Sequence, residues 1–311
     1  MSNLETPDEY EWGGDGSDLS QPVAEHVRAA LVPSDGNYPP PIDKLLKLGS
    51  PHNYKTLDAA VTPIELTEAH IPDLIRLARD RDLNIRSEDT PDTWAPIHAV
   101  LALARFDVGP YINQLLPLLD IESEWVTEEL PPILGKAGAP AVEPLREYVQ
   151  DSSRWLYGRW SAIRALSEAG KQHPELRNQV VALLSETLAN ERQPEVSAGL
   201  IAELTELKAV EALPAMRAAF ERDAVDEGIV GDWPEVLGAL GLPADPSDPL
   251  VEQARARRPV QQGGGRARQA AGRSAEPFPK ATASKPAKPS NRKNKRKTAA
   301  ASRKANKKKR K

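Results

Sequence analysis

The apolar positions of the chain recur in a two-part unit between Ile71 and Leu240. In the first part, a β-branched residue precedes a leucine by three positions, at Ile71/Leu74, Ile112/Leu115, Val142/Leu145, Val180/Leu183 (with Val181 alongside) and Val210/Leu213. In the second part, one leucine is shared by all units, at Leu103, Leu134, Leu166, Leu204 and Leu237, with separations of 31, 32, 38 and 33 residues. Both parts have the spacing of amphipathic helices, so each unit predicts a helix pair.

The predicted pairs are 71–80 with 94–106, 110–119 with 124–138, 138–151 with 154–170, 176–188 with 195–207, and 209–220 with 232–242. One such pair cannot bury its own apolar stripe, and a period in the thirties is typical of stacked helical repeats. We therefore predict an all-α fold, an α-solenoid of about five helix pairs with disordered termini.

The composition changes outside the repeats, and this change sets the predicted boundaries. Residues 1–36 are acidic and poor in apolar groups, which predicts a disordered segment, although residues 22–32 have the pattern of a short helix. Residues 37–63 contain, near their start, a run of three consecutive prolines followed by an apolar face, and they are predicted to cap the stack. The solenoid is expected over 64–245, and the Gly-, Pro- and Lys/Arg-rich residues 246–311 as a disordered basic tail.

Two segments of the third pair resemble a known repeat family. GAPAVEPL (138–145) leading to RWSAIRALSEAG (159–170) is similar to a HEAT repeat of the short type also found in phycobilisome-lyase-like proteins. The order YPPPIDKLLKLG, HIPDLIRLARD, WAPIHAVLALARF is similar to uncharacterised bacterial HEAT-repeat proteins, some of which end in a cysteine-rich zinc motif. This chain has no cysteine, so no zinc role is carried over.

The formal net charge of −4 conceals two oppositely charged regions. Residues 251–311 contain 21 lysines and arginines against two glutamates, a net charge of +19. The first 250 residues contain 20 Lys/Arg against 43 Asp/Glu, a net charge of −23. The acidic start lacks a signal-peptide pattern and no segment has the apolar length of a membrane span, so we expect a cytoplasmic protein.

The basic residues of the tail are densest at its end, where 12 of the last 20 residues are Lys or Arg. Such density favours contact with a polyanion such as RNA, DNA or a ribosome. A membrane surface is a weaker alternative, and a third is screening of the acidic body by the tail. The predicted polyanion-binding residues are Arg292, Lys293, Lys295, Arg296, Lys297, Arg303, Lys304, Lys307, Lys308, Lys309, Arg310 and Lys311.

Aromatic residues fall at a repeated position, nine residues before the shared leucine, at Trp94, Trp125 and Tyr157, with Trp155 and Trp160 close by. Large aromatic rings are usually buried, so packing between neighbouring pairs is one interpretation. The other is an aromatic ladder along an inner, partner-binding face.

Polar residues recur five positions before the same leucines, at His98, Glu129, Ser161, Gly199 and Asp232, which predicts a solvated inner face. His98 suits a structural hydrogen bond or a partner contact better than acid–base catalysis with Asp92. Glu128 and Glu129 are adjacent on a helix and point about 100° apart, which is a poor arrangement for sharing a proton.

No catalytic, cofactor or metal site is predicted, because nucleophile, phosphate-binding and metal-ligand motifs are missing from the sequence. We expect a non-enzymatic scaffold that binds a protein partner. Its predicted partner-binding residues are Trp94, His98, Trp125, Glu128, Glu129, Trp155, Arg159 and Trp160. The alternatives are a nucleic-acid- or ribosome-binding protein that acts through the tail and, as the phycobilisome-type resemblance implies, a bilin lyase-like enzyme. The oligomeric state is left open.

Overall fold

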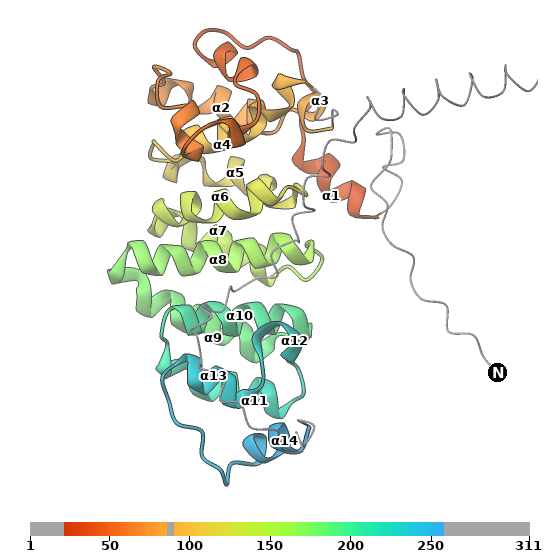
Figure 1. The fold of residues 1–311 in the computed structure, drawn as a ribbon, viewed down its shortest axis with the longest axis vertical. Helices are drawn as coiled ribbons and strands as arrows, with labels where there is room; N and C mark the ends of the chain where they lie inside the picture. The colour runs from red at the N-terminus through yellow and green to blue at the C-terminus, as the bar shows by residue number, and fades with distance from the viewer. Residues whose placement is uncertain (1–21, 86–89, 258–311) are drawn as a thin grey trace, which may run out of the picture. The chain divides into compact units, whose positions relative to one another are not determined.

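The computed structural model describes residues 22–85 and 90–257, and this part of the chain is built from α-helices and short 3₁₀ helices (Figure 1). The only β pairing among these residues is an isolated bridge between Val32 and Asp80. The predicted all-α class is confirmed.

The helices of the predicted units are present in all five places. We call the following elements the first helices: α2 (Ile71–Ala78), α5 (Ile112–Leu115), α7 (Ala139–Gln150), α9 (Arg177–Asn190) and α11 (Leu213–Glu221). The second helices are α4 (Ala95–Leu103), α6 (Glu124–Lys136), α8 (Leu156–Gln172), α10 (Pro194–Glu206) and α13 (Trp233–Ala239). Short 3₁₀ segments directly adjoin several of these helices, among them η5 (Pro91–Trp94) before α4, η6 (Gly109–Tyr111) and η7 (Leu116–Asp120) around α5, and η9 (Val210–Ala212) before α11.

The remaining elements connect or flank the pairs. They are α1 (Pro22–Ala30), α3 (Arg81–Asn84), α12 (Glu227–Val230) and α14 (Pro249–Arg257), with η1 (Ile42–Lys47), η2 (Pro51–Asn53), η3 (Leu57–Ala60), η4 (Glu68–His70) and η8 (Pro174–Leu176). In the segment predicted to be a cap, Ile42 and Leu45 are fully buried, and η1 and η3 pack on α4.

The repeated leucines form the core. Leu103, Leu134, Leu166 and Leu204 are each 0% exposed, as are Leu74, Leu115 and Leu145 of the first helices. Each fully buried leucine contributes about 1.5–3 kcal/mol relative to an exposed one. The fifth unit departs from the pattern, because Val210 is 47% exposed and Met216 is fully buried instead. The prediction that Val210 lies on the packed stripe of that helix is therefore wrong.

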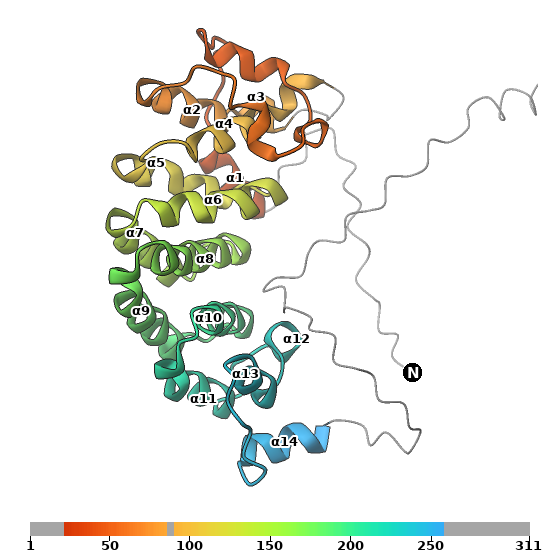
Figure 2. The ribbon, with the colours of Figure 1, turned by 60° about the vertical axis from the view of Figure 1, so that its left-hand side comes forward.

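Neighbouring second helices pack on one another in chain order, α4 on α6, α6 on α8 and α8 on α10, and the first helices α5, α7, α9 and α11 do the same. Figure 2 shows α7 and α9 on one side and α6, α8 and α10 on the other. A close backbone approach holds α6 against α8. A Cβ placed on Gly135 would lie 2.8 Å from the backbone nitrogen of Ala169.

The second helices run in the same direction, because their matching ends meet. At the carboxyl ends, Lys136 Nζ donates to the Ala104 carbonyl at 2.8 Å, and His173 Nε2 lies 2.9 Å from the Lys136 carbonyl. At the amino ends, Trp160 Nε1 donates to the Glu195 carbonyl at 2.9 Å. The starts of α4, α6, α8 and α10 therefore lie along one side of the helix layers.

Residues 22–36 are ordered, so the predicted disordered segment over 1–36 is wrong for this part, and the short helix indicated by the pattern of residues 22–32 is present as α1. The backbone of Val32 exchanges hydrogen bonds with Arg79 and Arg81, at 2.8 and 2.9 Å. Tyr38 donates to the buried carboxylate of Asp80 at 2.5 Å, and burial, followed by the hydrogen bond to Asp80 and its charge, raises the pKa of the Tyr38 hydroxyl. These long-range contacts compensate for the small apolar area of the segment. Residues 1–21 lie outside the described part.

The carboxyl boundary at 245 also needs correction, because α14 packs on α13 and buries Val251 and Ala254. Asp248 caps this helix by accepting from the Leu250 amide at 3.0 Å. The same carboxylate pairs with Arg217, at 2.5 and 3.0 Å. The sequence signal that was missed is the aspartate before Pro249, a common start of a helix.

Candidate functional site

Three aromatic rings meet at the amino ends of α4 and α6. Trp94 immediately precedes α4, and Trp125 is the second residue of α6. Their ring centroids are 6.3 Å apart in an edge-to-face arrangement, and the exposed imidazole of His52 from η2 lies 4.9 Å from Trp125 and 6.5 Å from Trp94. Both indoles are partly exposed. We call His52, Trp94 and Trp125 the first aromatic cluster.

A second aromatic cluster, Trp155, Tyr157 and Trp160, lies at the start of α8. Tyr157 is 5.1 Å from Trp155 and 5.4 Å from Trp160 between ring centroids. Its ring is 47% exposed, Trp155 is partly exposed, and Trp160 is 6% exposed. Tyr157 is the second residue of α8, as Trp125 is of α6. Since packed helices are about 8–10 Å apart, the two clusters occupy adjacent layers on the same side.

Carboxylates accompany the first cluster. Glu122, Glu124 and Glu128 are exposed, and among the described residues no cationic side chain lies within ion-pair distance of them. Beside the second cluster, the exposed Arg154 is already paired with Asp120 and Asp151, at 3.1 and 3.2 Å. Glu122, Glu124 and Glu128 therefore place unpaired negative charge beside the first cluster.

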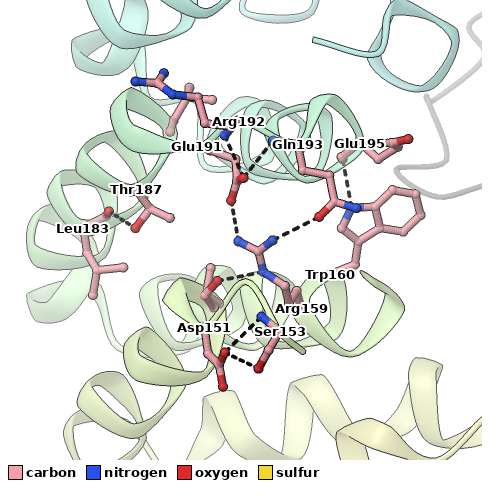
Figure 3. A network of polar contacts seen from close by, with 12 residues as sticks. Asp151, Ser153, Arg159, Trp160, Leu183, Thr187, Glu191, Arg192, Gln193 and Glu195 are labelled. Atoms are coloured by element: carbon pink, nitrogen blue, oxygen red, sulfur yellow. Dashed lines mark hydrogen bonds and ion pairs between the residues drawn. The ribbon is translucent and has the colours of Figure 1, made fainter. Parts of the chain in front are cut away.

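Two predicted partner-binding residues are buried in a structural network. Arg159 is 1% exposed and its guanidinium donates to the Val149 carbonyl at 2.8 Å, to Gln193 Oε1 at 3.2 Å and to the Glu191 carboxylate (Figure 3). The Glu191 carboxylate also accepts two backbone amides, at 2.8 and 2.9 Å. The network joins the end of α7 and the start of α8 to the loop before α10. The prediction that Arg159 contacts a partner is wrong, because no face of it is open.

The prediction that Trp160 contacts a partner is also wrong, because its side chain is buried. In Figure 3 its indole points toward the start of α10, where Nε1 reaches the Glu195 carbonyl. A Cβ on Gly199 would lie 2.8 Å from two atoms of the indole. Gly199 thus provides the space into which Trp160 packs.

His98 lies in α4 and is fully buried, so the prediction that it contacts a partner is wrong. Its Nε2 lies 2.7 Å from the Gly49 carbonyl and is the donor, because a carbonyl oxygen can only accept. Burial lowers the pKa of the imidazole, which opposes protonation. The structural hydrogen bond, one of the two alternatives drawn from the sequence, accounts for this residue.

The predicted solvated stripe is also wrong for most of its members. His98, Ser161 and Gly199 are buried, and Glu129 and Asp232 are partly exposed. Burial, followed by the charge of Glu128, raises the pKa of Glu129. This position of the repeat faces the neighbouring helices, so it carries packing residues and not a continuous binding stripe.

Of the partner-binding residues predicted from the sequence, Trp94, Trp125, Glu129 and Trp155 are partly exposed, and Glu128 is exposed. The structure adds His52, Glu122, Glu124 and Tyr157 to them. His52 could not be found by repeat alignment, because it precedes the first unit. Tyr157 could be aligned with Trp94 and Trp125 in the repeat, but nothing in the sequence indicates that its ring is the most exposed of the three.

Residues 22–85 and 90–257 lack two further kinds of feature. No group of three or more His, Asp or Glu side chains is placed there to hold a metal ion. No helix in these ranges has the length and hydrophobicity needed to cross a bilayer. All twelve predicted polyanion-binding residues, from Arg292 to Lys311, lie outside the described residues.

A family model described as "Protein of unknown function (DUF1186)" matches residues 58–236, which is more than half of the chain. No curated protein and no solved structure matches the chain.

Proposed function

We propose that the chain, which belongs to the DUF1186 family, is a non-enzymatic α-solenoid of HEAT-like helix pairs that binds a protein partner. The binding surface comprises the exposed parts of both aromatic clusters together with Glu122, Glu124 and Glu128. The ordered packing of first helices on first helices and second on second supports the repeat architecture. The absence of cysteine from the sequence suits a protein of the reducing cytoplasm.

One observation carries this proposal: aromatic rings remain partly exposed beside unpaired carboxylates along one side of three packed helices. Tryptophan and tyrosine dominate the binding energy of protein interfaces, because they bury a large area at low entropic cost. Exposing several of them together on a water-facing surface is unfavourable unless a partner covers them.

The test is partner capture from native lysate by full-length protein carrying Glu124→Lys and Glu128→Lys. The matched control carries Glu147→Lys and Glu186→Lys, which make the same charge change at exposed positions of the first helices α7 and α9. The proposal expects the first variant to lose a captured protein that the control retains, with both variants folded. Equal capture by the two variants would exclude the surface.

A second candidate function rests on the charge of the tail. With +19 on residues 251–311 and −23 on the first 250, the tail attracts polyanions and the body repels them. Deleting residues 290–311 should then abolish binding to RNA or DNA, and full-length binding should weaken steeply with salt. Nucleic-acid binding that persists after this deletion would exclude the candidate.

A further inference from the structure

The spacing of the two aromatic clusters suits an extended ligand. Trp125 and Tyr157 hold the same position on α6 and α8, which pack on each other. Neighbouring packed helices are about 8–10 Å apart. A polyproline II segment has three residues per turn and rises about 3.1 Å per residue, so its turns repeat every 9 Å or so. Prolines placed three residues apart would therefore meet the two clusters in succession.

The rings themselves favour such a ligand. Proline-rich segments bind to surfaces lined by aromatic side chains, since the ligand is already extended and loses little entropy on binding. Tyr157 presents about half of its surface, and Trp125 stands edge to face with Trp94. These orientations leave ring surfaces open to a pyrrolidine ring.

The carboxylates of the surface favour basic residues between the prolines of the ligand. Glu122, Glu124 and Glu128 are exposed and unpaired within the described part of the chain. Lysine or arginine side chains on the ligand would pair with these carboxylates, and they would also stack over the indoles. A phosphate backbone would be repelled here, which disfavours single-stranded nucleic acid even though bases can stack on aromatic rings.

We infer that the surface formed by the exposed rings of the two aromatic clusters and by Glu122, Glu124 and Glu128 binds a basic, proline-spaced segment of a partner protein in extended form. This inference rests on the proposed function and specifies the chemistry of the partner.

The probe is a synthetic peptide with Pro-Lys-Ala repeated three times, about 28 Å long in the polyproline II conformation. Its binding to the full-length protein is measured by calorimetry and by tryptophan fluorescence. The control peptides replace every proline by alanine, or every lysine by glutamate. An oligouridylate of similar length tests the nucleic-acid alternative.

Specific binding of the first peptide should be weakened about tenfold or more by Tyr157→Ala and by the pair Glu124→Lys and Glu128→Lys, as expected for loss of an interface anchor. Val210→Ala removes an equally exposed apolar side chain elsewhere, 47% exposed as Tyr157 is, and should have no effect. Unfolding curves of each variant establish that the fold is kept.

Equal binding of the alanine control peptide, or binding that is insensitive to Tyr157→Ala, would overturn the inference. Preference for the oligouridylate at this surface would overturn it as well. If the peptide fails to bind while capture of a protein still depends on Glu124 and Glu128, the inference fails and the proposed function stands. If the peptide fails to bind and protein capture does not depend on Glu124 and Glu128, the inference and the proposed function are both rejected.

Discussion

Arg159 and Glu191 form an ion pair in which both side chains are withdrawn from water, at 2% and 9% exposure. The pair connects the start of α8 with the loop between α9 and α10, across two helix pairs. Buried ion pairs cost desolvation energy, so their net contribution is small, but removing one partner leaves the other charge buried and unpaired.

Arg159→Met is therefore expected to destabilise the protein by about 3–5 kcal/mol, because the Glu191 carboxylate loses its counter-charge. The measurement is equilibrium unfolding in urea. Arg146→Met is the matched control, since Arg146 pairs with Glu143 on the exposed surface of α7 and should change stability little. Similar losses in the two variants would contradict the structural role of Arg159.

The contact between Gly199 and Trp160 gives a second prediction. Gly199→Ala places a Cβ within 2.8 Å of the indole, and this overpacking is expected to cost about 1–3 kcal/mol. Gly238 lies inside α13 with no heavy atom within 4 Å of an added Cβ. Gly238→Ala should stabilise by about 0.5–1 kcal/mol, because alanine is the better helix former. Thermal unfolding distinguishes the two, and stabilisation of both would contradict the tight packing of α8 on α10.

Asp248 tests whether α14 belongs to the folded body. Asp248→Ala removes the helix cap and the partner of Arg217, and loss of the cap alone costs about 1 kcal/mol. Amide hydrogen exchange over α14 should accelerate and Val251 should become exposed. Asp245→Ala alters a neighbouring exposed turn and is the control. Unchanged exchange in Asp248→Ala would show that the cap does not hold α14.

Glu203 predicts a pH dependence of stability. It is 1% exposed in α10, and burial raises the pKa of its carboxyl above the ordinary value of 4.5. The folded state then binds the proton more tightly than the unfolded state. Its stability contribution is fully present below pH 4.5 and is lost as the pH rises through the folded pKa.

Glu203→Gln should consequently be more stable than the wild type near neutral pH and equal to it below pH 4.5. Urea unfolding across this pH range is the measurement, with Glu186→Gln at an exposed position of α9 as control. A constant difference between wild type and Glu203→Gln at every pH would refute the titration of this group.

The helix pairs were predictable because their burial repeats with the helical period. Leu103, Leu134 and Leu166 marked equivalent buried positions, and each second helix contains its predicted leucine. Periodicity reports which residues face other protein, but it does not distinguish a neighbouring helix from a partner. Arg159 illustrates this limit, since arginine is rarely buried and only a distant glutamate, 32 residues away, allows it here.

The terminal elements were missed for a different reason. Residues 33–37 and α14 have few apolar positions and no repeat signal, and polar contacts help to fix both segments. Asp80 accepts hydrogen bonds from Ser34 and Tyr38, and Asp248 accepts them from Arg217 and Trp233, all distant in the sequence. These partners are brought together only by the tertiary fold, so the local sequence around each segment does not indicate them.

The most direct test of the central claim is partner capture by Tyr157→Ala compared with Val210→Ala, using full-length protein and native lysate. Both variants remove an apolar side chain that is 47% exposed, but only Tyr157 belongs to the proposed binding surface. The account predicts that Tyr157→Ala loses a captured protein that wild type and Val210→Ala retain. Capture of the same protein, in the same amount, by all three would contradict it.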